Sequence, residues 1–240
     1  AGTSFTNDAS STGIGTIDSN GSVSSDAGFG IVKWSGTGSA GTIAHNMGST
    51  PSFLIIKRLS DANWLVQATT LGYGNYLALN TTGASASAST LVTGVSSTLV
   101  TLGDNGSVNG SGQDYIGYFF SEKQGYSKFG SYTGNGNADG TFVYTGFKPA
   151  FVLCKNTGNG GAQWLMVDNK RVGINPIENY LQSNSSSAEG SDTANFDFLS
   201  NGFKCRSTNS WSNQSGYNII YMAFSENPFT TSSGIPACAR

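Results

Sequence analysis

The stretch "FGSYTGNGNADGTFVYTGFKPAFVLCKN" at residues 129–156 decides the fold, because nearly the same wording stands at residues 31–58 as "IVKWSGTGSAGTIAHNMGSTPSFLIIKR". Self-similarity at a fixed offset marks a repeated structural unit. The offset begins at 98 residues and widens to 104 through small insertions, as these matches show: Gly36 with Gly134, Pro51 with Pro149, Tyr76 with Tyr180, and Glu122 with Glu226. The sequence therefore predicts one unit copied in tandem, at residues 29–124 and 125–228.

Each copy is predicted to be all-β. Runs such as "FGIVKW", "SFLIIKR" and "DYIGYFF" are rich in β-branched and aromatic residues. Turn-forming Gly, Asn, Ser and Pro separate them at about the ten-residue spacing of a sandwich. No segment carries a helical apolar stripe. We expect two antiparallel β-sandwiches of a jelly-roll or lectin-like kind, although two sheets of one larger sandwich fit the same pattern.

The two ends of the chain have no counterpart inside the repeat. Residues 1–28 carry only Phe5, Ile14, Ile17 and Val23 as larger apolar side chains, too few for a core of their own. We expect an extended N-terminal arm that packs on a neighbouring subunit or on the first unit. Residues 229–240 form a tail of similar composition.

Composition excludes several classes of protein. Charged residues make up 11% of the chain and the net charge is −2, so there is no basic stripe of the kind that binds nucleic acid. No apolar run reaches the 18 residues of a membrane span, and the first residues lack the features of a signal peptide. The three cysteines are an odd count and do not suggest a disulfide framework.

The repeat also separates scaffold from candidate sites, because a residue that both copies carry at one place is explained by the shared fold. His45, aligned with Tyr144, is the only histidine and has no catalytic motif around it. The acids common to both copies, Glu122 and Glu226, end the last strand of each unit. Zinc spacing is absent from the cysteines. We therefore expect no enzymatic activity, no metal and no cofactor.

Two further residue types are interpreted as core. Cys154 stands where the first copy has Ile56, which is typical of a cysteine that acts as a small buried hydrophobe. Trp64 and Trp164 recur in "WLV" and "WLM", and both are predicted to lie in the cores of their units.

Copy-specific residues are the candidates for binding. Trp211 lies among turn formers in "STNSWSNQSG", where the first copy has no aromatic residue, and Asn213 is close by. An exposed aromatic face can stack on a sugar ring while amides bond its hydroxyls, although the sequence favours a Trp211 ring that folds back on its own unit. Tyr73 and Arg171 are further candidates for a glycan or partner contact.

The wording of the chain also resembles a known kind of domain. The phrases "DASSTGIGTIDSNGSV", "GYSKFGSYTGNGNADGTFVYTGFKPAFVLCK" and "LSNGFK" are similar to a duplicated β domain of uncharacterised function in virion and tail-fibre-like proteins of marine bacteriophages. The likeness covers about residues 1–229. It implies a structural protein on the particle surface, assembled in the host cytoplasm. The usual ending has a short basic tail, whereas this chain ends in "TTSSGIPACAR".

Three functions follow from these observations. The first is a tail fibre or adhesin that binds host surface glycans. The second is a capsid decoration or cement protein that binds only other virion proteins. The third is a depolymerase, which the sequence does not favour. We expect partners among the virion proteins and a homo-oligomer, a trimer by analogy with fibres.

Overall fold

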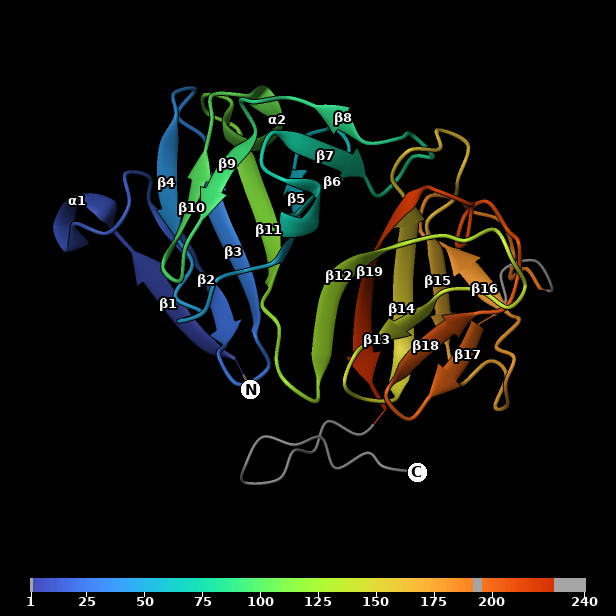
Figure 1. Cartoon of the computed structure of the whole chain (residues 1–240). Coiled ribbons are helices and arrows are strands. Elements are labelled where there is room, and N and C mark those ends of the chain that lie inside the picture. The colour runs from blue at the N-terminus through green and yellow to red at the C-terminus, as the bar shows by residue number, and fades with distance from the viewer. Residues whose placement is uncertain (1, 192–195, 227–240) are drawn as a thin grey trace. The chain divides into compact units, whose positions relative to one another are not determined.

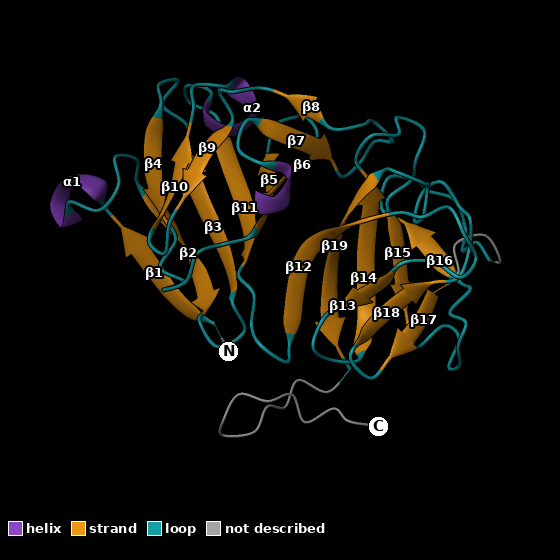
Figure 2. Ribbon diagram, viewed as in Figure 1, coloured by secondary structure: helices purple, strands orange, loops and turns teal. Residues whose placement is uncertain are grey.

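Strands form throughout the chain wherever the sequence has short runs of β-branched and aromatic residues. The computed structural model describes residues 2–191 and 196–226, and it is nearly all-β, with 44% strand and 5% helix (Figures 1 and 2). The predicted all-β class with antiparallel sheets is confirmed. The tail at residues 229–240 and Cys238 lie outside the described residues.

The first unit comprises the described residues up to Ala78 together with Ala86–Ser121. Its larger sheet is antiparallel, in the order β1-β2-β3-β11-β5-β6-β7-β8, and its smaller sheet has the order β4-β10-β9. Its strands are β1 (Thr3–Asn7), β2 (Ser19–Ser24), β3 (Phe29–Ser35), β4 (Gly41–Ala44), β5 (Phe53–Arg58), β6 (Leu65–Ala68), β7 (Asn75–Ala78), β8 (Ala86–Ser87), β9 (Val92–Val95), β10 (Leu99–Leu102) and β11 (Asp114–Phe120). Its helical turns are α1 (Ala9–Thr12), η1 (Thr69–Leu71) and α2 (Gly106–Asn109).

The second unit comprises Leu79–Ser85 and the described residues from Glu122 onward. A five-stranded sheet in the order β12-β19-β14-β15-β16 and a three-stranded sheet in the order β13-β18-β17 enclose its core. Its strands are β12 (Ser127–Thr133), β13 (Phe142–Tyr144), β14 (Pro149–Asn156), β15 (Leu165–Asp168), β16 (Tyr180–Gln182), β17 (Phe196–Leu199), β18 (Gly202–Cys205) and β19 (Asn218–Ser225).

The strand orders of the two units correspond element by element. The order β3-β11-β5-β6-β7 corresponds to β12-β19-β14-β15-β16, and β4-β10-β9 corresponds to β13-β18-β17. Side chains at matched places also make matched bonds: Trp34 Nε1 donates to the Val108 carbonyl (2.9 Å), and the Tyr132 hydroxyl donates to the Ser212 carbonyl (2.6 Å). The tandem duplication and the jelly-roll comparison stay predictions, and these correspondences support the first of them.

The N-terminal arm is part of the first unit. Its strands β1 and β2 extend the larger sheet beyond β3, and the Thr16 and Ile17 amides both donate to the Thr42 carbonyl on β4 (2.9 and 3.0 Å). Ile17 and Val23 are buried in the core cluster. The few apolar residues of the arm did not predict that it belongs to the core of the first unit. Two of them are enough, because β3 and β4 supply the rest of that core.

The two repeated tryptophans differ in burial. Trp164 is 1% exposed, as predicted, whereas Trp64 is 36% exposed, so its assignment to the core is wrong. Both precede a leucine that belongs to the core cluster of its unit. Both tryptophans stand immediately before a strand, β6 and β15 respectively, so strand alternation does not fix the direction of either ring. Trp64 stacks on Tyr118 at a centroid distance of 6.2 Å and keeps part of its surface in water.

The structure corrects the alignment around His45 by one residue. The amide of His45 donates to Thr98 O, and the equivalent bond in the second unit runs from the amide of Thr145 to Asn201 O. Thr145 therefore matches His45, and Tyr144 matches Ala44. Because a one-residue shift reverses the face to which a strand side chain points, His45 is buried and Tyr144 is exposed.

His45 is held neutral by its contacts. The ring is 0% exposed, Nε2 donates to Ser96 O (3.2 Å), and Nδ1 accepts from the Met47 amide (3.3 Å). Burial lowers the pKa of His45, while the hydrogen bond to Ser96 opposes that shift. The unfolded chain then binds a proton at higher pH than the folded chain does.

We expect stability to fall as the pH drops below about 6.5, where the unfolded histidine becomes protonated. Thermal unfolding at pH 7.5 and 5.5 measures the loss, and His45→Gln, which can donate and accept without titrating, should show a smaller loss. Because His45 is the only histidine, equal losses in the two proteins would contradict this account.

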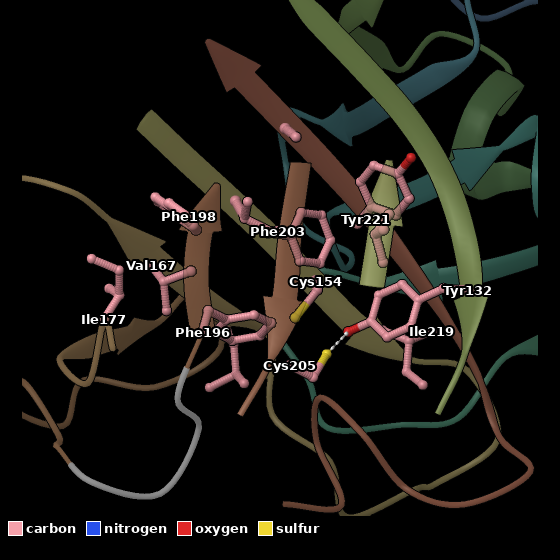
Figure 3. Packing of buried hydrophobic residues seen from close by; sticks show 14 of the residues in the cluster. Tyr132, Cys154, Val167, Ile177, Phe196, Phe198, Phe203, Cys205, Ile219 and Tyr221 are labelled. Carbon is pink, nitrogen blue, oxygen red and sulfur yellow. Dashed lines mark hydrogen bonds between the residues drawn. The ribbon is translucent and has the colours of Figure 1, made fainter. Parts of the chain in front are cut away.

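The second core contains two buried thiols. Cys154 and Cys205 are free and fully buried, like Ile56 in the first unit, which confirms the interpretation of Cys154. Figure 3 shows both sulfur atoms near the Tyr132 hydroxyl, 3.6 Å from the Cys205 sulfur. Burial raises the pKa of Cys205 to about 12 and that of Cys154 further. Both thiols are free and lie among the apolar side chains of the core cluster, so the pair packs as two small hydrophobes.

A matched lysine is the next-to-last residue of β5 and of β14. Lys57 Nζ donates to the carbonyls of Arg58 and Asp61 (both 2.6 Å), and Lys155 Nζ donates to those of Asn156 and Asn159 (2.8 and 3.4 Å). Lys155 is 0% exposed, and desolvation lowers its pKa to about 8. Both lysines therefore close the turn that follows their strand.

Candidate functional site: a polar groove in the first unit

A groove of about 650 Å³ lies on the first unit where the arm joins β3. Arm residues 6–8 and 16–20 line it together with residues 33–35 of β3, and Thr37, Leu59 and Asp114 complete it. This volume is within the range of about 300–1,000 Å³ that small-ligand sites have. The groove is therefore a candidate ligand-binding site.

Strand register brings its polar side chains together. On one row across the sheet Thr6 pairs with Asn20, and Asn20 pairs with Lys33. On the next row Ser35 pairs with Asp114. Since alternate residues of a strand point to the same face, Lys33 and Ser35 project on one side with Asp114.

The carboxylates of the groove are fixed by short hydrogen bonds. The Asp8 carboxylate accepts from the amides of Ser10 and Ser11 (3.0 and 3.1 Å), and hydrogen bonds from the Ser10 side chain and these amides lower its pKa. The Asp18 carboxylate accepts from the Ala9 amide (2.8 Å), and the Asp114 carboxylate accepts from the Ser35 hydroxyl (2.6 Å). Each keeps a second oxygen for another donor.

Buried polar residues hold the arm in place beneath the groove. The Asn7 amide donates to Ile14 O (2.9 Å) and accepts from the Thr12 hydroxyl (2.9 Å). The Ser19 hydroxyl donates to Ala44 O on the facing sheet (2.9 Å). Both side chains are at most 5% exposed, so the groove has a rigid wall.

The electrostatics of the groove disfavour an anionic ligand. Asp8, Asp18 and Asp114 face a single cation, Lys33, which makes no ion pair with any described residue. Hydroxyl and amide side chains supply the remaining polar lining. Such a set can accept and donate hydrogen bonds to a neutral, hydroxyl-rich molecule.

The groove is specific to the first copy. The second unit has no arm, and at the strand positions of Lys33 and Asp114 it carries Ser131 and Asn218. The comparison of copies that led to other candidates could have found these two charges. Both positions are charged in the first copy and uncharged in the second.

The predicted site residues do not line this groove. Trp211 is partly buried against the second core, with its ring 6.0 Å from that of Tyr180 in an edge-on arrangement. Arg171 is paired with Asp168 and Glu189, each at 2.7 Å. Tyr73 is 46% exposed in a loop of the first unit. None of the three is among the residues that line the groove.

Asn213 is a structural residue of the second unit. It is 0% exposed, and its Nδ2 donates to the carbonyls of Asn137 (2.8 Å) and Ser207 (2.9 Å). Its Oδ1 accepts from the Asn135 amide (3.0 Å). Asn109 makes the equivalent bonds in the first unit, to Ser39 O, Gly103 O and the Thr37 amide. The amide group that was predicted to bind a sugar hydroxyl thus holds the glycine-rich hairpin.

Among the described residues, neither the possible metal ligands nor the two glutamates common to both copies are grouped into a site. Within residues 2–191 and 196–226, no three His, Cys, Asp or Glu side chains are grouped so that they could hold a metal ion. Glu122 pairs with Lys128 (2.7 Å) and Glu226 with Lys148 (3.0 Å), as strand-end charges. No helix in the described part of the chain has the length and apolar character to cross a membrane.

Comparison with known families matches nearly the whole chain to one of them. Residues 4–228 match a family described as a domain of unknown function (DUF7483). The chain belongs to this family. The match spans the arm as well as both units, so the DUF7483 domain includes the segments that build the groove. No curated protein and no solved structure matches the chain significantly.

Proposed function

We propose that the chain is a structural protein displayed on the surface of a bacteriophage particle, and that its first unit binds host surface glycans. The resemblance of its phrasing to virion and tail-fibre-like proteins supports the particle assignment. Other virion proteins, and further copies of the chain, are its partners in this proposal. It carries out no enzymatic reaction.

The observation that carries glycan binding is the groove built by the arm. Neutral saccharides present alternating hydroxyl donors and acceptors, and carboxylate, amide and hydroxyl side chains bind both. The fold of the second unit forms without an arm, so the arm and its charged lining are not needed to complete such a sandwich. A capsid decoration protein that binds only virion proteins has no need for this groove.

Affinity electrophoresis tests the proposal on the full chain. The protein is run through gels containing dextran, mannan or alginate. We expect retardation by a neutral polysaccharide and little by anionic alginate, because the groove holds three carboxylates and one lysine.

The matched variant is Lys33→Ser with Asp114→Asn, which installs the residues of the second unit at the same strand positions. It should keep its melting temperature and bind at least about tenfold more weakly, since two charged hydrogen-bonding groups are lost. Absence of retardation by all three polysaccharides, or equal retardation of the variant, would rule out the groove as a glycan site. Immunogold labelling of intact particles tests display independently.

A further inference from the structure

The second unit exposes two aromatic rings on the outer face of its smaller sheet. Phe142 is 43% exposed and Tyr144 is 65% exposed, both on β13. Val143 between them points into the core, so alternation sends both rings outward. An exposed pair of large aromatic side chains is more informative than a single exposed apolar residue.

Register makes this face flat. One row across the sheet is Phe142, Lys204 and Asp197, and the next is Tyr144, Gly202 and Leu199. A Cβ atom placed on Gly202 would lie 3.1 Å from Cε2 of Phe142, so the phenyl ring lies against the glycine. No side chain rises between the two rings at that position.

Charged groups border the rings. Lys204 pairs with Asp139 (2.5 Å), and Arg206 pairs with Asp197 (3.3 Å). Two cations and two carboxylates leave the border neutral, with donors and acceptors side by side. Planar apolar surface next to paired polar groups suits a ligand that has an apolar face and a rim of hydroxyls.

The fold itself does not require these rings. With the corrected register, the first unit has Thr42 and Ala44 at the positions of Phe142 and Tyr144. Its smaller sheet forms with those small side chains. The aromatic pair is therefore specific to the second copy, and the one-residue slip in the sequence alignment concealed it.

We propose that this face is a carbohydrate-contact surface, on which pyranose rings stack against Phe142 and Tyr144 while hydroxyls bond to the Lys204 and Arg206 ion pairs. The two rings together offer at most about 500 Å², below the roughly 800 Å² that each partner contributes to a stable protein interface. The inference rests on the proposed function for its ligand class. It adds a second contact site for glycans, on the other unit of the same chain.

Dextran and mannan fragments are the probes, used with full-length protein carrying ¹³C-labelled tyrosine. We expect the Tyr144 ring resonances, assigned through Tyr144→Phe, to shift on addition of a neutral fragment. Phe142→Thr with Tyr144→Ala, which reproduces the first unit, should bind about fivefold more weakly. Tyr144→Phe should bind nearly as well as the wild type, because the stacking face remains.

The outcomes separate this surface from the groove. Loss of binding in both the aromatic double variant and the groove variant supports two contacts. Wild-type affinity of the aromatic variant, with unshifted Tyr144 resonances, overturns the surface and leaves the groove standing. A change in oligomeric state by light scattering without a change in saccharide affinity assigns the face to contacts between copies, and also overturns it. No binding to either probe overturns both proposals.

Discussion

Gly134→Ala is expected to destabilise the second unit by about 3 kcal/mol, and Gly36→Ala to do the same to the first. A Cβ atom on Gly134 would lie 2.3 Å from the carbonyl oxygen of Gln214, and one on Gly36 would lie 2.3 Å from that of Gly110. Both distances are far inside van der Waals contact, and both obstacles are backbone atoms.

The backbone around these glycines cannot move aside. The Gly134 amide donates to Tyr217 O and its carbonyl accepts from the Gly216 amide, both at 2.9 Å. Gly36 is held in the same way, by Gln113 O (2.8 Å) and the Gly112 amide (2.9 Å). Relief of the clash therefore breaks hydrogen bonds of the sheet end.

Chemical denaturation measures the loss, and hydrogen–deuterium exchange locates it. Gly134→Ala should speed exchange in β12, β13 and β19, and Gly36→Ala in β3, β4 and β11. The matched controls are Gly173→Ala, whose Cβ would meet nothing within 4 Å, and Gly94→Ala, whose nearest contact is 3.5 Å. A Gly134→Ala protein as stable as Gly173→Ala would contradict the steric argument.

Asn213→Ala is the second large effect, with an expected loss of about 3 kcal/mol. The side chain is buried, and its removal leaves the Asn137 and Ser207 carbonyls and the Asn135 amide without their partner. Asn109→Ala should cost a similar amount in the first unit, where the same bonds hold the hairpin after β3.

Asn213→Asp distinguishes hydrogen bonding from volume. The carboxylate keeps the shape of the amide but presents oxygen to two carbonyls, so at neutral pH the variant should be at least as unstable as Asn213→Ala. Protonation restores one donor, and its stability relative to wild type should recover toward acid pH. Asn20→Ala, at an exposed position, is the control and should unfold like the wild type. Loss of stability in Asn20→Ala equal to that in Asn213→Ala would argue against a special role for the buried amide.

The sequence predicted the scaffold well at positions where the fold accepts only one kind of residue. Gly36 and Gly134, or Lys57 and Lys155, recur because the same close approach or the same strand end requires them. The all-β class followed from short runs of β-branched and aromatic residues separated by turn-forming residues. The difference in burial between Trp64 and Trp164 could not be predicted, because the repeated wording around them does not state which neighbouring segments cover each ring.

The candidate sites were harder to find, for two reasons. Polar residues such as Asn213 satisfy buried backbone groups as readily as they bind a ligand, and composition does not distinguish these uses. In addition, the sequence alignment of the two copies is out of step by one residue after the glycine-rich hairpin, so it matches Tyr144 with His45 instead of with Ala44. In a strand that error exchanges the inside for the outside, so the exposed aromatic pair was concealed.

The pairing of β3 with both the arm and β11 also determines when the groove can exist. Asp114, on β11, comes about 80 residues after Lys33 and Ser35 on β3, and pairings this distant in sequence form slowly. A nascent chain on the ribosome has its arm long before it has the strand that completes the lining. The groove is therefore complete only after β11 has been synthesised and has paired with β3, so the saccharide binding that we propose for the first unit requires that pairing.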